Sequence, residues 1–133
     1  FLDMQPQERY PYIVATFDVG LVTLNARVKT PVIPSKIISI MAAGRSFVAS
    51  LPEGDAANLV RVANSGLVVP PESSNELKAA LLHLYEHPDV RKRLGENGRR
   101  YVEDNLTADK AAATIQEICQ ITRKRGKEPK LQS

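Results

Sequence analysis

The sequence predicts an α/β fold with a doubly wound parallel sheet. Three short apolar runs alternate with helical patterns in the first 72 residues, and no strand pattern follows residue 73. Parallel strands must be joined by crossover connections, so this alternation favours a parallel sheet covered by helices. The chain has 133 residues, of which 43% are hydrophobic and 25% charged, a composition typical of one soluble domain.

The three predicted strands cover residues 18–24, 46–50 and 67–69. Each is short and apolar, which is typical of strands that are buried on both faces. The pair Pro70 and Pro71 closes the third run, because proline cannot donate a ladder hydrogen bond.

Helical patterns flank the first strand. The first pattern covers residues 7–17 despite its internal proline. Residues 25–34 contain two prolines and two basic residues, so we expect them to form a loop. Ser35 is then the expected N-cap or first-turn residue of a short apolar helix, which Gly44 ends.

Two further helices lie around the third strand. One is expected to begin at Asp55 and to run to about residue 64, with Gly66 as its stop. The next covers residues 73–86 and opens on the capping box Ser73-x-x-Glu76. Its predicted apolar face carries Leu77, Leu81, Leu84 and Tyr85.

The last third of the chain is predicted to be helical, with helices over 88–104 and 107–124 and Thr107 as the N-cap of the second. We therefore divide the single domain 1–133 into an alternating part over 1–72, a helical ending over 73–124 and a basic flexible tail over 125–133. The charges of the helix over 88–104 have the interleaved pattern of a solvent-facing helix. They are Arg91, Lys92, Arg93, Arg99 and Arg100 among Glu96, Glu103 and Asp104.

The net charge of +3 is concentrated near the end of the chain. Five basic residues there are opposed only by Glu128, and they are Arg123, Lys124, Arg125, Lys127 and Lys130. Such a segment suits contact with anionic head groups at the inner face of a membrane, or with nucleic acid. The plainer interpretation, a solvated and frayed terminus, is favoured.

Several classes of function are excluded by composition. No run approaches the roughly 20 apolar residues of a membrane span, and the sequence opens at Phe1 without a basic segment, so we expect neither a membrane span nor a signal peptide. The single cysteine, Cys119, excludes an internal disulfide framework, fits a reducing cytoplasm and is expected to pack in the core. His83 and His87 lack the partners of a metal site, and no cofactor is indicated. Aromatic residues are only 5%, without a nucleic-acid-binding module.

A ligand site is expected where the predicted strands end, because loops there lead into helix N-termini that attract anions. The loop over 25–34 combines Lys29 with Ser35 and Lys36, which suits a phosphate or diphosphate group. The alternative is that Ser35 only caps the helix and Lys36 is solvated. In the loop before the helix expected at Asp55, Glu53 and Asp55 would repel phosphate but could accept hydrogen bonds from sugar or ribose hydroxyls. A turn with a helix cap explains these residues equally well.

The run PVIPSKIISIMAAGRSFVAS at residues 31–50 resembles a segment of the retaining GT-B glycosyltransferases of group 1, or family 4 type. It is similar to the carboxyl-terminal, donor-binding domain of that family. DVGLVTL before it and EGDAANLV to EDNL after it resemble the same domain in the same order, so the resemblance covers about residues 1–120. The nearest subgroup is the one that builds bacterial cell-surface polysaccharide.

This resemblance implies a two-domain enzyme with facing Rossmann-like halves. Its activity would be metal-free transfer of a sugar, with retention, from a nucleoside diphosphate-sugar donor to a polysaccharide or lipid-linked acceptor. The amino-terminal half would be a separate partner region, and the family's diphosphate-binding turn would lie upstream of Phe1. The 133 residues alone are therefore expected to be inactive.

Residue by residue, the resemblance places Ser35 and Lys36 against the donor diphosphate. The family's two glutamates fall at Pro31 and Ser39, so Ser39 is left with at most one hydroxyl contact to the ribose. Ser46 stands where the family commonly has proline. These departures keep two alternatives open: an interaction domain without a donor site, and a nucleotide-sugar 2-epimerase of the same architecture.

Overall fold

A computed structural model describes residue 3 and residues 5–27 and 33–110. Lys29, Pro31 and Cys119 lie outside these residues, as do the basic tail and most of the helix predicted over 107–124. At the edge of the described part, the Thr107 hydroxyl accepts a hydrogen bond from the Lys110 amide (3.4 Å), as the predicted N-cap requires.

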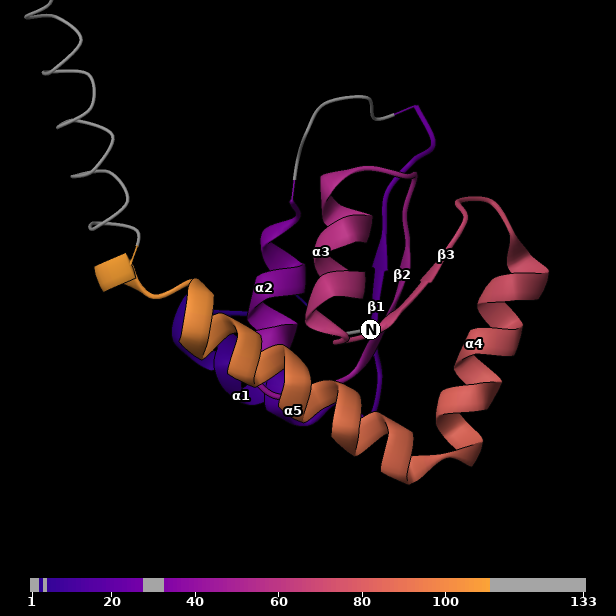
Figure 1. Ribbon diagram of the computed structural model, residues 1–133. Helices are drawn as coiled ribbons and strands as arrows, with labels where there is room; N and C mark the ends of the chain where they lie inside the picture. Colours follow the sequence, from indigo (N-terminus) through magenta and orange to yellow (C-terminus); the bar gives the residue numbers. More distant parts are fainter. Residues whose placement is uncertain (1–2, 4, 28–32, 111–133) are drawn as a thin grey trace, which may run out of the picture.

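Three parallel strands form the sheet in the order β1-β2-β3 (Figure 1). They are β1 (Gly20–Thr23), β2 (Phe47–Ser50) and β3 (Leu67–Val69). Gly20 is opposite Phe47 in the register, and Val48 is opposite Leu67. The predicted α/β fold with a parallel sheet is confirmed, and its architecture is that of a partial Rossmann-like fold.

Helices cover both faces of the sheet (Figure 1). On one face lie α2 (Ser35–Ala42) and α3 (Asp55–Ala63), which are the crossovers between successive strands. On the other face α4 (Ser74–Glu86) packs against β2 and β3. β2 separates these layers because its side chains alternate: Phe47 packs into the core beneath α2 and α3, whereas Val48 packs with residues of α4.

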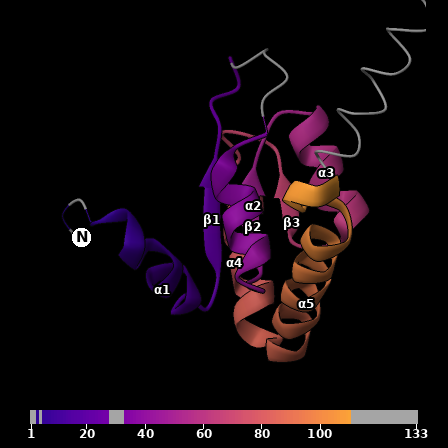
Figure 2. The same ribbon diagram turned by 90° about the vertical axis from the view of Figure 1, so that its left-hand side faces the viewer.

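Two more helices complete the described part. The longest is α5 (Pro88–Asn105), which passes the end of the sheet where the strands begin and packs against α2 and α3 (Figure 1). α1 (Tyr10–Ala15), preceded by the 3₁₀ turn η1 (Gln7–Arg9), lies to the side and contacts α2 (Figure 2). None of the helices in the described residues is long and apolar enough to span a bilayer.

The contact between α2 and α5 depends on glycine. A Cβ atom on Gly95 would lie 2.2 Å from the carbonyl oxygen of Gly44, and one on Gly98 would lie 3.2 Å from Cγ of Met41. Gly44 itself adopts the left-handed conformation, with φ of 68°, directly after α2. The two helices therefore approach backbone to backbone at the turn that ends α2.

Three local predictions are wrong. The helix predicted over 7–17 is divided into η1 and the six-residue α1, because Pro11 is tolerated only in a first turn and the Thr16 hydroxyl bonds the Ile13 carbonyl (2.7 Å). The capping box at the start of α4 does not form, because Ser73 makes no side-chain capping hydrogen bond and its hydroxyl donates to the Glu76 carboxylate instead (3.3 Å). Tyr85 is 77% exposed and does not share the buried face of α4. The predicted end of α3 near residue 64 is confirmed, since the helix ends at Ala63 and its C-cap Asn64 adopts φ of 45°.

Candidate functional site

The carboxyl ends of the three strands lie at one edge of the sheet, and the loops to α2, α3 and α4 leave from it (Figure 1). In open α/β sheets this edge is where ligands bind. Ser35 and Lys36 begin α2 on this edge, and Glu53 lies in the loop between β2 and α3. The structure thus brings these three predicted residues to one edge.

The start of α2 differs in charge from the two other helix starts at this edge. α2 has no acidic residue in its first turn, whereas α3 has Asp55 and α4 has Glu76. Ser35 and Lys36 are exposed, and the N-cap residue of α2 is Pro34, which makes no side-chain capping hydrogen bond. First-turn amides of a helix lack partners within the helix. The start of α2 therefore favours an anion over the other two.

Ser39 lies one turn further along α2. Its hydroxyl donates a hydrogen bond to the Ser35 carbonyl (3.0 Å), and the residue is half-buried. It lines a mostly apolar cavity of about 370 Å³ between α1 and α2, together with Tyr10 and Val14. Ser39 thus belongs to the groove beside α1 as well as to the helix that starts at the strand edge.

Glu53 is engaged by Arg61 of α3. Two hydrogen bonds join the side chains, 2.6 Å to Oε1 and 2.7 Å to Oε2, in the fork geometry of an arginine–carboxylate pair. These hydrogen bonds hold the pKa of Glu53 below its ordinary value and raise the pKa of Arg61. Glu53 is therefore an ionised, oriented acceptor that any ribose hydroxyl would share with Arg61.

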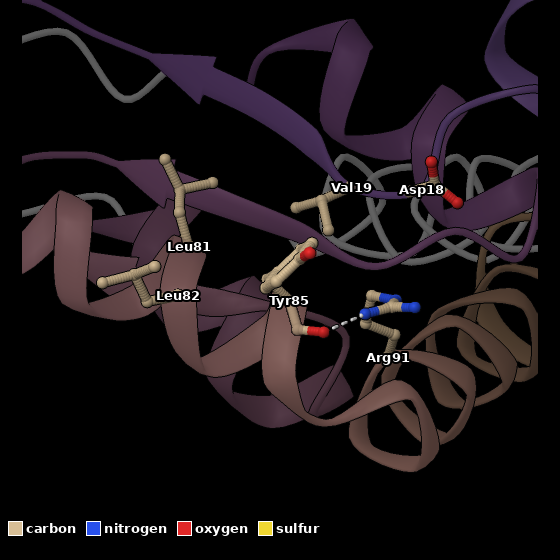
Figure 3. Close-up of a pocket in the computed structure, with 6 residues that line it drawn as sticks. All are labelled: Asp18, Val19, Leu81, Leu82, Tyr85 and Arg91. Carbon is tan, nitrogen blue, oxygen red and sulfur yellow. Dashed lines mark hydrogen bonds between the residues drawn. The ribbon is translucent and has the colours of Figure 1, made fainter.

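A second hollow lies near the opposite ends of the strands. Figure 3 shows this pocket of about 540 Å³ between α4 and the residues that precede β1, with Tyr85 and Leu81 on the α4 side and Val19 on the other. Arg91 lies at one end of it and donates hydrogen bonds to the carbonyls of Leu84 and Tyr85, the latter at 2.9 Å.

The prediction that all the charged residues of α5 face solvent is wrong for Arg91. This residue is half-buried and satisfies carbonyls at the end of α4, which is a tertiary role that charge spacing does not reveal. The other charges follow the prediction, with exposed pairs of Lys92 with Glu96 (3.9 Å) and Arg99 with Glu103 (2.8 Å). In the sequence, the pair His87 and Pro88 indicates a turn between α4 and α5. That turn brings Arg91 close to the end of α4.

Within residues 3, 5–27 and 33–110, no group of three or more metal-ligating side chains occurs. His83 and His87 are exposed and lie one above the other, with ring centroids 4.4 Å apart. Nδ1 of His87 is 2.8 Å from the His83 carbonyl oxygen, so it contacts the end of its own helix.

The chain is similar to an uncharacterized glycosyltransferase of Methanocaldococcus jannaschii, with 29% identity over 84 residues. The similarity covers 63% of this chain and 21% of that protein, so the chain matches about a fifth of the relative's length. No protein-family model and no solved structure matches. The comparison supports a glycosyltransferase relationship.

Proposed function

We propose that this chain is the nucleotide-sugar-binding part of a GT-B glycosyltransferase. The enzyme transfers a sugar from a nucleoside diphosphate-sugar to a polysaccharide or lipid-linked acceptor. The observation that carries the proposal is the start of α2, where Ser35 and Lys36 face solvent at the carboxyl edge of the sheet with no acidic residue in the first turn. Similarity to a glycosyltransferase supplies the class of reaction.

The chemistry of glycosyl transfer fits such a helix start. The leaving nucleoside diphosphate develops negative charge, which fixed amides, a hydroxyl and an ammonium group stabilise without a metal. We assign the diphosphate to Ser35, Lys36 and Lys29, and the hydroxyls of ribose or sugar to Glu53 and Ser39. With Pro31 and Ser39 in place of the family's glutamates, we assign the carboxylate of the site to Glu53, which Arg61 holds by two hydrogen bonds.

The open edge of the sheet supports a larger enzyme around this part. In the described residues β1 pairs only with β2, and Leu21 of β1 is 52% exposed. The amides of Gly20 and Leu24 point to β2, so those of Leu21 and Thr23 point away from it. An unpaired edge with an apolar side chain is normally covered, so we propose that the rest of the enzyme completes the sheet here.

The test is titration calorimetry of the full-length protein with nucleoside diphosphate-sugars. Lys36→Ala is expected to weaken binding about tenfold, as loss of a charged contact to phosphate should. Lys78→Ala, which removes an exposed lysine of α4 on the other face of the sheet, is the matched control and should bind as the wild type does. Equal affinity for Lys36→Ala and wild type would remove Lys36 from the site, and absence of binding to every donor would overturn the function.

A second candidate is an interaction domain that keeps the fold without a donor site. The specific observation in its favour is that Pro31 and Ser39 stand at the positions of the family's two glutamates, and that the Ser39 hydroxyl is already bonded to Ser35. Turnover of a donor sugar by the full-length protein would rule it out.

Contact with the inner face of the membrane is a separate proposal, which rests on the basic segment that begins at Arg123. Anionic lipid attracts such clusters. Sedimentation with anionic liposomes should fall when residues 123–133 are deleted, and unchanged sedimentation would contradict the proposal.

A further inference from the structure

A small polar cavity of about 330 Å³ lies at the amino-terminal end of the sheet, away from the edge just described. Its walls come from the turn after α2, the residue before β2 and the first turns of α5. It adjoins the pocket of Figure 3, with which it shares Asp18 and Arg91. Nothing in the proposed donor site uses these residues.

Ser46 lines this cavity and has a buried hydroxyl without a hydrogen-bond partner in the described part of the chain. The residue is only 2% exposed. The Gly20 amide donates to the Ser46 carbonyl (2.9 Å), so Ser46 continues the ladder between β1 and β2. Its side chain therefore alternates with Phe47 and faces the side of Val48, toward α4, α5 and the cavity. Buried hydroxyls normally have a hydrogen-bond partner, so we expect a bound group to supply one for Ser46.

Three cationic side chains surround the same cavity. Arg91 donates from Nη1 to the carbonyls at the end of α4, and its Nε and Nη2 make no hydrogen bond within the described residues. Arg45 is half-buried and donates one hydrogen bond from Nη2 to the Ala15 carbonyl, which leaves its remaining N–H groups open. Lys92 has only a long, exposed pair with Glu96 at 3.9 Å.

The start of α5 adds to the positive potential. Pro88, Arg91 and Lys92 of its first turns line the cavity, and α5 has 18 residues, so its dipole is well developed. Three carboxylates oppose this field: Asp18 and Glu96 at the cavity, and Asp89 in the first turn of α5, all of them exposed. Cations and anions are thus equal in number around the cavity, and the case for an anion rests on the unused N–H donors of the cations.

We propose that this cavity is a second anion site, which binds the phosphate group of inorganic phosphate or of a small phosphomonoester. The forked N–H groups of Arg91 and Arg45 match the spacing of phosphate oxygens, Lys92 adds charge, and the Ser46 hydroxyl donates to an oxygen at the floor of the cavity. The site lies at the opposite ends of the strands from Ser35 and Lys36, so it is occupied independently of the donor.

The experiment is titration of the full-length protein with inorganic phosphate, followed by amide chemical shifts and calorimetry. Lys92→Gln and Ser46→Ala should each weaken binding by about threefold to tenfold, because each removes one donor. Asp18→Asn should strengthen binding, since it removes an opposing charge. Arg93→Gln is the control, because Arg93 is exposed on α5 outside the cavity.

Two arms identify the site and its ligand. Lys36→Ala should leave this phosphate binding unchanged, which separates it from the proposed donor site and makes failure of either proposal visible on its own. Tighter binding of glycerol phosphate than of inorganic phosphate assigns the site to a phosphomonoester, and the reverse assigns it to the free ion. Loss of affinity in Arg93→Gln equal to that in Lys92→Gln, or unchanged affinity in Ser46→Ala, would overturn the proposal.

Discussion

Gly95→Ala tests whether the close approach of α2 and α5 holds the described fold together. The added Cβ would lie 2.2 Å from the Gly44 carbonyl oxygen and 2.8 Å from the Gly44 carbonyl carbon. Ordinary contacts of a Cβ atom are 3.4 Å or longer, so the helices must separate by about 1 Å. The obstacle is backbone in the left-handed turn that ends α2, which cannot rotate away as a side chain would.

Two opposing terms give the magnitude. Alanine in place of glycine inside a helix stabilises by up to about 1 kcal/mol. Forced expansion of a packed contact costs about 1–3 kcal/mol, and here it also loosens the close approach of Gly98 to Met41. The upper part of that range applies because the clash is with main chain, so the expected net loss in free energy of unfolding is about 2 kcal/mol.

Urea unfolding followed by circular dichroism measures this change. Arg93→Ala is the matched control, because Arg93 is exposed on the same helix and its replacement should alter stability by no more than about 0.5 kcal/mol. A Gly95→Ala variant as stable as the wild type, or more stable, would refute the described contact between α2 and α5.

Two further predictions concern single side chains. Glu72 adopts φ of 63°, a conformation unfavourable for residues with a Cβ, so Glu72→Gly should raise the free energy of unfolding by about 0.5–1 kcal/mol in thermal denaturation. Glu72→Ala, which keeps the Cβ, should show no such gain, and a matching gain would point to charge as the cause. The pKa of Glu53 is lowered by Arg61, so their pairing persists above that pKa and is lost as pH falls through it. Carboxyl NMR titration should show the Glu53 midpoint rising toward 4.5 in Arg61→Gln, and an unmoved midpoint would disprove the pairing.

The sequence was a good guide where one short segment determines its own structure. The three apolar runs became β1, β2 and β3, because each is buried on the face that packs beneath helices. The helix start at Ser35 was equally local, since a proline before it and a glycine after it mark both ends. Ser35, Lys36 and the strand ends could thus be placed together from the sequence alone.

The rest depended on contacts between distant residues. The pairing of Glu53 with Arg61 needs the turn into α3 to bring the two within 2.6 Å. In the sequence Arg91 has the spacing of a surface charge. In the structure the turn between α4 and α5 brings it to the Leu84 carbonyl. The buried hydroxyl of Ser46 is invisible in a sequence that places it in an apolar run.

The turn at Gly44 has a consequence for ligand affinity at the far end of α2. One end of this eight-residue helix is held against the backbone of α5, and Ile37, Ile40 and Met41 are buried along its length. Its first-turn amides therefore keep their direction whether or not an anion is present. A ligand of the proposed site at Ser35 would meet donors already in position, so none of its binding free energy would be spent on ordering the helix.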